Sequence, residues 1–368
     1  DPKSSFLTEI ASTIGVLEHA IKNVDKWTKD EKRPSNVDRP FFIRMLMGLL
    51  GSKSYIKYQP LGTVGVISPW NFPVNLILAP LGGIFAAGNR AMIKPSELTP
   101  ATSEVTKKMF EAYFDKSEAA VFTGDAEVGA AFSALPFDHL LFTGGTQIGK
   151  KVMKAASDNL VPVTLELGGK SPVIVDENAD LSEVAKKVMR GKTMNAGQIC
   201  LAPDYLMLPK GKSEEFAKAS NEAISEMFAD LKYNEDYTSV INERHYERIN
   251  ELVSDAKEKG AEVIQINPAD EDFEQQELHK IPPTLVLNPT DEMKIMQEEI
   301  FGPVLPVKEY EDFDETVNYV NSKDRPLGLY LFSKDKNKEK KVLDNTTSGG
   351  VTLNDVLWHI GQEELPFG

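Results

Sequence analysis

The chain of 368 residues contains only one cysteine, Cys200. A single thiol excludes an internal disulfide and any metal site built from several thiolates. Any sulfur chemistry must therefore pass through this one atom. The alternative is that Cys200 is a small buried hydrophobic residue, as most free cysteines are. One cysteine also fits a reducing compartment, so we expect a cytoplasmic protein.

The sequence also lacks a long apolar run and an excess of basic residues. Its most apolar stretch, residues 76–88, is too short to span a bilayer and is interrupted by Pro80, Gly82 and Gly83. We therefore expect a buried helix there, and neither a signal peptide nor a membrane segment. The net charge of -15 disfavours nucleic acids and anionic membranes as partners, because both repel an acidic surface.

Short apolar strands alternate with amphipathic helices through most of the sequence. The first half predicts strands at 63–68, 91–94, 119–122 and 138–142 and helices at 76–88, 99–114, after Asp125 and at 146–157. The second half predicts strands at 173–175, 205–208, 261–266 and 329–332 and helices after Asp180 and at 213–231, 243–259 and 313–321. This alternation is typical of parallel sheets covered by helices, so we expect an α/β fold with two parallel-sheet domains.

Three segments stand apart from this alternation. Residues 1–33 have apolar residues at helical spacing and are expected to pack on the first domain. Residues 54–58 predict an exposed strand within an oligomerisation-type segment near 52–62, because such an edge often pairs with another subunit. The acidic segment 268–276 is interpreted as a surface loop without chemistry.

A glycine-rich turn spans residues 142–150, with the sequence FTGGTQIGK. It follows a predicted strand and opens a helix, where backbone amides favour a phosphate. It nearly matches a P-loop, but Lys151 stands where Ser or Thr is required, and a second near match at 169–171 has Thr164 in place of the leading glycine. The G-x-G-x-x-G fingerprint is absent, so the turn indicates either a nucleotide site or only a tight strand-to-helix connection.

Two further motifs follow predicted strands. Lys94 and Glu97, in the run KPSE, have the chemistry to hold ribose hydroxyls, although a solvated loop pair is the alternative. Asn71, in the run PWNFP, offers a side-chain amide for an oxyanion, or it caps the following helix.

Two further motifs each contain a carboxylate. Glu166, in LELGGKSP, is expected to have a raised pKa suited to a general base, unless a buried Lys or Arg pairs with it. Glu299 and Phe301, in EEIFGPV, have the spacing to position a ribose and a nicotinamide ring, or they form a turn with a core Phe.

Taken together and in order, these motifs resemble the motif series of the NAD(P)-dependent aldehyde dehydrogenases. The six motifs are PWNFP (69–73), KPSE (94–97), FTGG-x-x-x-G (142–149), LELGGKSP (165–172), N-x-GQ-x-C (195–200) and EEIFGPV (298–304). The resemblance extends from about residue 59 to 368. The runs 202–205, 349–355 and 365–368 are similar to the class 3 and coniferyl-aldehyde-dehydrogenase-like branch.

The resemblance implies that an aldehyde is oxidised to a carboxylic acid. Cys200 would attack the carbonyl carbon, and the oxyanion would be held by the Asn71 side chain and the backbone amide of Cys200. After hydride transfer, Glu166 would activate the water that hydrolyses the thioester. No metal is required. The substrate is expected to be an aromatic or medium-chain aliphatic aldehyde, and Trp358 and His359 either line its pocket or only pack.

The resemblance also implies a cofactor site in a domain formed by residues 1–168, with a catalytic domain at 169–368. The cofactor-binding residues are Trp70, Lys94, Ser96, Glu97, Gly144, Gly145, Thr146, Gly149, Leu167, Glu299 and Phe301. We expect NAD, because the charge of Glu97 repels a 2′-phosphate, with NADP as the alternative.

Two departures from the family leave alternatives open. The chain lacks the first helical segments before Asp1 and the glycine-rich continuation and final strand after Gly368, so both ends are interpreted as cut and a homodimer is expected of the full-length protein. Gly145 replaces a larger polar residue found in many relatives. The competing hypotheses are a CoA-acylating dehydrogenase, which Glu166 argues against, and a truncated non-catalytic relative. A P-loop nucleotidase is disfavoured by Lys151 and Thr164.

Overall fold

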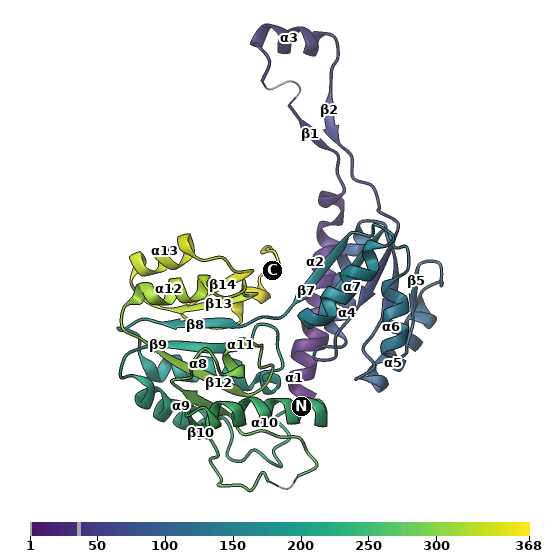
Figure 1. Cartoon of the computed structure of the whole chain (residues 1–368). Coiled ribbons are helices and arrows are strands. Elements are labelled where there is room, and N and C mark those ends of the chain that lie inside the picture. Colours follow the sequence, from purple (N-terminus) through teal and green to yellow (C-terminus); the bar gives the residue numbers. More distant parts are fainter. Residues whose placement is uncertain (1, 35–37, 275) are drawn as a thin grey trace. The chain divides into compact units, whose positions relative to one another are not determined.

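The computed structural model describes residues 2–34, 38–274 and 276–368, which form two compact units (Figure 1). The N-terminal unit comprises Pro2–Thr143 and Gln147–Leu165, and the C-terminal unit comprises Glu166–Gly368 with Gly144–Thr146. The assignment of cofactor binding to residues 1–168 and of catalysis to 169–368 stays a prediction.

The N-terminal unit is built on a five-stranded sheet with the order β5-β4-β3-β6-β7. Its strands are β3 (Thr63–Ile67), β4 (Arg90–Lys94), β5 (Ala119–Val121), β6 (His139–Gly144) and β7 (Val163–Leu167). Strand β4 pairs in parallel with β3 and β5, and β3 pairs in parallel with β6. The helices are α4 (Asn75–Ala86), α5 (Pro100–Tyr113), α6 (Ala126–Ser133) and α7 (Thr146–Ser157). The predicted alternation of strands and helices is confirmed.

Apolar side chains of β3, β4 and α4 form the core of this unit, including Val66, Ile77, Leu81 and Ile93. Helix α4 is the expected buried helix, and it packs against the N-terminal helix α2 (Ser12–Trp27). Contact between the two helices is close at Gly82, where a Cβ would lie 3.2 Å from the Leu17 side chain. The expectation that the first helical segment packs on this domain is therefore confirmed.

A two-stranded arm joins α2 to the sheet (Figure 1). Strand β1 (Glu31–Arg33) pairs antiparallel with β2 (Ser54–Ile56), and the helix α3 (Phe41–Leu49) lies between them in the chain. The predicted exposed strand is present in a shorter form as β2. Helix α3 was not expected from the sequence, and none of its residues is buried.

The C-terminal unit is built on a seven-stranded sheet with the order β10-β11-β12-β9-β8-β13-β14. Its strands are β8 (Ser171–Val175), β9 (Pro203–Pro209), β10 (Glu262–Gln265), β11 (Thr284–Leu287), β12 (Val304–Tyr310), β13 (Gly328–Phe332) and β14 (Gly350–Leu353). All neighbours pair in parallel except β10, which runs antiparallel to β11. An edge strand of opposite direction is common on such sheets, and the expected parallel-sheet α/β domain is confirmed.

Helices of the C-terminal unit connect these strands. They are α8 (Leu181–Thr193), α9 (Ser213–Met227), α10 (Glu243–Glu258), α11 (Lys294–Gln297), α12 (Phe313–Asn321) and α13 (Lys336–Asn345), with short 3₁₀ turns at Met194–Gly197 and Trp358–Gly361. In the part of the chain that the structure describes, no helix is long and apolar enough to cross a membrane.

The sequence predicts that Thr99, Asp125 and Asp180 cap the helices that follow them, and these three predictions differ in outcome. Asp125 and Asp180 each accept hydrogen bonds from two backbone amides of the following helix, as expected. Thr99 precedes Pro100 at the first helical position, but its hydroxyl makes no capping bond. Among the described residues that hydroxyl is buried without a hydrogen-bond partner, so the helix α5 begins where predicted although its cap was wrongly assigned.

Candidate active site

Cys200 follows a sharp turn at the end of α8. Three successive residues have positive φ, at 49° for Asn195, 51° for Ala196 and 71° for Gly197. Left-handed backbone at non-glycine residues is strained and is often found at functional sites. A Cβ at Gly197 would lie 2.3 Å from the carbonyl oxygen of Gly302, so the turn also requires glycine for its close approach to that loop.

Gln198 anchors this turn to a distant segment. Its side-chain amide donates to the carbonyls of Asn195 and Ser239 at 3.0 and 3.1 Å. Its side-chain oxygen accepts from the backbone amide of Ile241 at 3.0 Å. With both ends of a buried amide bonded, the backbone that leads into Cys200 is held in one conformation.

The Cys200 thiol is half-buried in an environment that disfavours its ionised form. Burial raises its pKa to about 12, and the negative charges of Glu299 and Glu166 add to this effect. The backbone amides of Cys200 and Leu201 act in the opposite direction. Beside the thiol, the Tyr330 hydroxyl donates to the Leu201 carbonyl at 2.6 Å. The resting group is therefore a thiol that needs a proton acceptor before it can act as a nucleophile.

Glu166 lies near the end of β7 and is half-buried. Burial raises the pKa of its carboxyl, as expected from the apolar sequence around it. No ion pair with Glu166 is found among the described residues, so the alternative of a partner Lys or Arg has no support there. The carboxylate faces Gly368, where a Cβ would lie 3.4 Å from Glu166 Oε2.

Glu299 lies against the backbone that follows β7. A Cβ at Gly168 would fall 2.0 Å from Glu299 Oε2, so a side chain at this position would displace the carboxylate. Burial raises the pKa of Glu299 to about 8, and the charge of Asp204 adds to this. The Gly169 amide, Lys170 and Arg248 lower it. The sequence assigned Glu299 to ribose binding alone and missed its electrostatic effect on Cys200.

A buried ionic group holds the loop that carries Glu299. Lys170 pairs with the buried Asp204 and donates to the carbonyls of Ile295 and Glu298, at 2.7 and 3.0 Å. Asp204 accepts from the amide of Ile300 at 3.1 Å.

Arg248 completes this arrangement from α10. Its guanidinium donates to the carbonyl oxygens of Glu299 and Ile300, at 3.3 and 2.5 Å. The next residue, Phe301, has a φ of 48°, so its backbone too is strained. Lys170 and Asp204 lie within the recognised motifs, but their pairing depends on contacts that spacing does not reveal.

A second buried cation, Lys192, lies in the last turn of α8. The residue is fully buried, and no hydrogen-bond partner for its Nζ is found in the described part of the chain. Burial lowers its pKa to about 8, although Asp204 and Glu299 favour the charged form. Lysine is a common helix residue, and nothing in the local sequence marks this one as buried.

In the N-terminal unit, Lys94 ends strand β4. Its side chain is 3% exposed, and its Nζ donates to the Pro95 carbonyl at 3.0 Å and to Glu97 Oε2 at 3.2 Å. Ser96 accepts from the amide of Leu98 at 3.2 Å, while the Glu97 side chain stays 45% exposed. The loop therefore presents one buried ammonium donor and one half-exposed carboxylate acceptor, which together suit a pair of ribose hydroxyls.

The glycine-rich turn connects β6 to α7 as predicted. Gly144 ends the strand, and Thr146 opens the helix. A Cβ at Gly145 would meet nothing within 4 Å, and the residue is exposed. Buried Gly149 lies one turn into α7. Exposed amides at the start of a twelve-residue helix fit a pyrophosphate.

The predicted site residues fall in both units. The C-terminal unit holds Cys200, Glu166, Leu167, Glu299, Phe301, Gly144, Gly145 and Thr146, and the N-terminal unit holds Trp70, Asn71, Lys94, Ser96, Glu97 and Gly149. Within the C-terminal unit, Cys200, Glu166 and Glu299 interact electrostatically. Trp70 and Asn71 are half-buried in the loop before α4.

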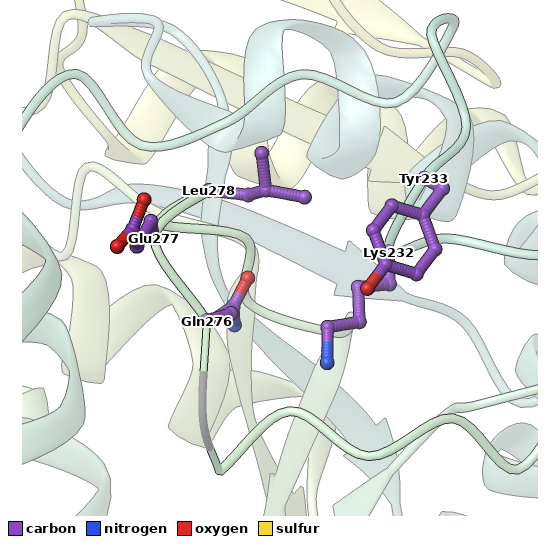
Figure 2. A pocket seen from close by; sticks show the side chains of 5 residues that line it. All are labelled: Lys232, Tyr233, Gln276, Glu277 and Leu278. Carbon is purple, nitrogen blue, oxygen red and sulfur yellow. The ribbon is translucent and has the colours of Figure 1, made fainter.

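A pocket of ≈ 520 Å³ lies elsewhere on the C-terminal unit, and none of the predicted site residues lines it. Figure 2 shows Lys232 and Tyr233 on one side and Gln276, Glu277 and Leu278 on the other. The Glu271 carboxylate accepts hydrogen bonds from the backbone amides of Leu231 and Lys232. These bonds connect the segments on the two sides of the pocket. Glu271, in the acidic segment, therefore has a structural role in this surface.

Comparison with known proteins identifies close relatives over the whole chain. The profile of the Aldehyde dehydrogenase family matches residues 1–368. The chain is 58% identical over 367 residues to a probable coniferyl aldehyde dehydrogenase of Caulobacter vibrioides. It is 50% identical over 366 residues to a coniferyl aldehyde dehydrogenase of a Pseudomonas species. Each alignment covers 100% of this chain and 74% of the relative.

Solved structures match the fold equally well. The substrate-bound AldH of Staphylococcus aureus has a TM-score of 0.89 and 38% identity, covering 99% of this chain and 76% of that one. An aldehyde dehydrogenase of Mycobacterium tuberculosis complexed with NAD+ has a TM-score of 0.85 and 25% identity, covering 100% of this chain and 73% of that one.

Proposed function

Because the chain belongs to the aldehyde dehydrogenase family, we propose that Cys200, Glu166 and Asn71 carry out its reaction, the NAD(P)-dependent oxidation of an aldehyde to a carboxylic acid. The observation that carries this assignment is the half-buried thiol of Cys200 interacting with two carboxylates of raised pKa, Glu166 and Glu299. A nucleophile and a base in mutual interaction are what covalent acyl chemistry requires.

In the proposed mechanism the Cys200 thiol loses its proton to a neighbouring carboxylate and attacks the aldehyde carbon. The Asn71 amide and the backbone amide of Cys200 donate to the resulting oxyanion. NAD(P), held by the residues proposed below, would supply the hydride acceptor for this oxidation. Glu166 then takes a proton from a water molecule while the water oxygen attacks the thioester carbon. The bond between this carbon and the Cys200 sulfur breaks, and the carboxylic acid leaves.

For the cofactor we propose that Lys94 and Glu97 hold the adenosine ribose and that the Gly144–Gly149 turn lines the pyrophosphate. Ser96 and Trp70 belong to the same two loops. Glu299, Phe301 and Leu167 are assigned to the nicotinamide half. The half-exposed Glu97 carboxylate favours NAD over NADP, because it repels a 2′-phosphate.

For the substrate we propose coniferyl aldehyde or a related aromatic aldehyde. The two relatives above that carry this name are 58% and 50% identical to the chain. A medium-chain aliphatic aldehyde is the competing substrate. An acylating reaction, in which coenzyme A releases the thioester, is disfavoured by the half-buried Glu166 carboxylate, whose raised pKa suits a base that activates water.

We further propose a cytoplasmic homodimer. The single, free cysteine suits a reducing compartment. The arm exposes Phe41, Phe42, Leu49 and Leu50 to at least 65% each, and such an apolar surface favours a partner. Residues 29–58 carry seven Lys or Arg against three Asp or Glu, opposite to the acidic chain as a whole, so a second copy offers complementary charge. Sedimentation of Leu49→Asp beside the wild type tests this, and an unchanged mass would overturn it.

Absorbance of NADH tests the catalytic assignment directly. The wild type is expected to oxidise coniferyl aldehyde with NAD, and Cys200→Ser to have no measurable turnover. Asn71→Ala is expected to lose about 10²-fold in kcat, the cost of removing one oxyanion donor. Comparison with an aliphatic aldehyde of similar length ranks the substrates. Turnover by Cys200→Ser would overturn the covalent mechanism.

A further inference from the structure

Helix α4 begins directly after the loop that carries Asn71, and it lacks a cap of its own. Its first hydrogen bond runs from the Leu76 amide to the Phe72 carbonyl at 3.0 Å. Phe72 has no side-chain oxygen, and Pro73 has no amide hydrogen. The amides of Val74 and Asn75 are therefore donors that a capping side chain would normally satisfy, and the N-cap residue Val74 makes no side-chain capping bond.

Glu9, more than sixty residues earlier in the chain, supplies this cap. Its Oε2 accepts from the amide of Val74 at 3.0 Å and from the amide of Asn75 at 2.7 Å. The partial positive charge at the start of a helix attracts the carboxylate, although burial is the larger effect and raises the pKa of Glu9. The side chain is half-buried, so the interaction is only partly screened by solvent.

The side chain of Asn75 adds a second attachment. Its amide donates to the hydroxyl oxygens of Ser12 and Thr13 at 3.0 and 2.9 Å. Thr13 in turn donates to the carbonyl of Glu9 at 2.5 Å. The first turn of α4 is thus bonded to three residues of the N-terminal helix.

The backbone around Glu9 is itself unusual. Residues Phe6–Ala11 form a π-helical turn between the short helix α1 (Pro2–Ser5) and α2. π-helical turns are rare and occur frequently at functional sites. Here the turn includes Glu9, whose carboxylate reaches the start of α4. A surface helix with only a structural role would not require such a turn.

We propose that Glu9 is a positioning residue for Asn71, holding the start of α4 so that the Asn71 amide is aimed at the oxyanion. The inference rests on the oxyanion role proposed above. Asn71 immediately precedes Phe72, whose carbonyl accepts the first bond of the helix, and Pro73 restricts the backbone between them. Movement of the first turn is therefore transmitted to Asn71 over two residues.

Removing the carboxylate should reduce the rate of the chemical step. Glu9→Ala leaves two amides of α4 without an acceptor, and a shift of about 1 Å in a catalytic donor costs up to about 10²-fold in rate. We expect kcat to fall about tenfold or more in Glu9→Ala, and less in Glu9→Gln, which keeps an oxygen but not the charge. The Kd for NAD is expected to stay within about twofold, because neither variant touches the proposed cofactor residues.

A double-mutant cycle separates positioning from a general structural effect. If Glu9 acts through Asn71, the double variant Glu9→Ala, Asn71→Ala is expected to be no slower than Asn71→Ala alone. Glu18→Ala, which removes an exposed carboxylate from the same N-terminal helix, is the matched control and should match the wild type. The alkylation rate of Cys200 should be unchanged in all variants.

The outcomes distinguish the two proposals. Wild-type kcat in Glu9→Ala, or losses that multiply in the double variant, would overturn the positioning role alone. Wild-type kcat in Asn71→Ala would overturn the oxyanion role and the positioning role with it. If Glu9→Ala does not fold, Glu9→Gln decides: a lowered kcat that disappears in the Asn71→Ala background supports the proposal, and an unchanged kcat overturns it.

Discussion

Glu299 and Gly168 are packed so closely that a Cβ at Gly168 would lie 2.0 Å from Glu299 Oε2. The contact links the loop after β7 to the loop before β12, and both lie in the C-terminal unit. Since Glu299 also raises the pKa of Cys200, the absence of a methyl group at Gly168 determines where a charge that acts on this thiol is located.

Gly168→Ala is therefore expected to displace the Glu299 carboxylate and to lower kcat/KM by about 10²-fold, as misplacement of a site group does. Steady-state NADH formation measures this. Gly83→Ala is the matched control, because a Cβ at Gly83 meets nothing within 4 Å and should leave kcat/KM unchanged. Full activity in Gly168→Ala would contradict the importance of the Glu299 position.

Alkylation of Cys200 tests the electrostatic effect of the two carboxylates. Their negative charges raise the thiol pKa, so Glu166→Gln and Glu299→Gln should lower it and increase the thiolate fraction at a given pH. We expect faster reaction with iodoacetamide at pH 8 in both variants, even though Glu166→Gln loses turnover. Slower alkylation in either variant would indicate that the missing carboxylate removes the thiol proton.

The pH profile of kcat/KM should contain a limb with a midpoint near 8, from Glu299. Its carboxyl is ionised above this pH, and we expect the rate to rise with ionisation because the anion is then available as a proton acceptor. In Glu299→Gln that limb should disappear, while the limb from Glu166 remains. A profile that is the same in the variant and the wild type would assign the limb to another group.

Lys192→Met is expected to stabilise the fold at neutral pH. Burial without a hydrogen bond lowers the lysine pKa from 10.5 to about 8, so its charge disfavours the folded state by roughly 3 kcal/mol below pH 8. That penalty declines as pH rises from 8 and is absent above 10.5, where the unfolded chain is also neutral. Denaturation at pH 7 and pH 10 should show a gain in the variant at pH 7 that shrinks at pH 10. An equal effect at both pH values would contradict this.

Much of the fold follows from local sequence. Apolar runs such as 63–68 predict parallel strands because both faces are buried, and Asp125 and Asp180 cap helices through bonds to amides only two or three residues away. The same local logic fails for Thr99, whose hydroxyl is buried without forming the cap. The antiparallel direction of β10 also depends on how the chain connects it to β11. No local sequence pattern encodes that connection.

The site was predictable to a similar extent. Motif resemblance led to the family, its activity and its NAD(P) dependence, and the relatives confirm all three. The catalytic and cofactor roles of individual residues stay predictions. The pairing of Lys170 with Asp204, the cap that Glu9 provides and the burial of Lys192 arise from contacts between segments far apart in sequence. Residue types alone do not reveal such contacts.

The backbones at Gly197 and Gly302 meet with room for no side chain between them. Two loops more than a hundred residues apart in sequence thus pack through direct contact between their backbones. An insertion in either loop would displace the turn that leads into Cys200. We therefore expect natural and laboratory evolution to substitute side chains around these two loops while keeping the length of both loops fixed.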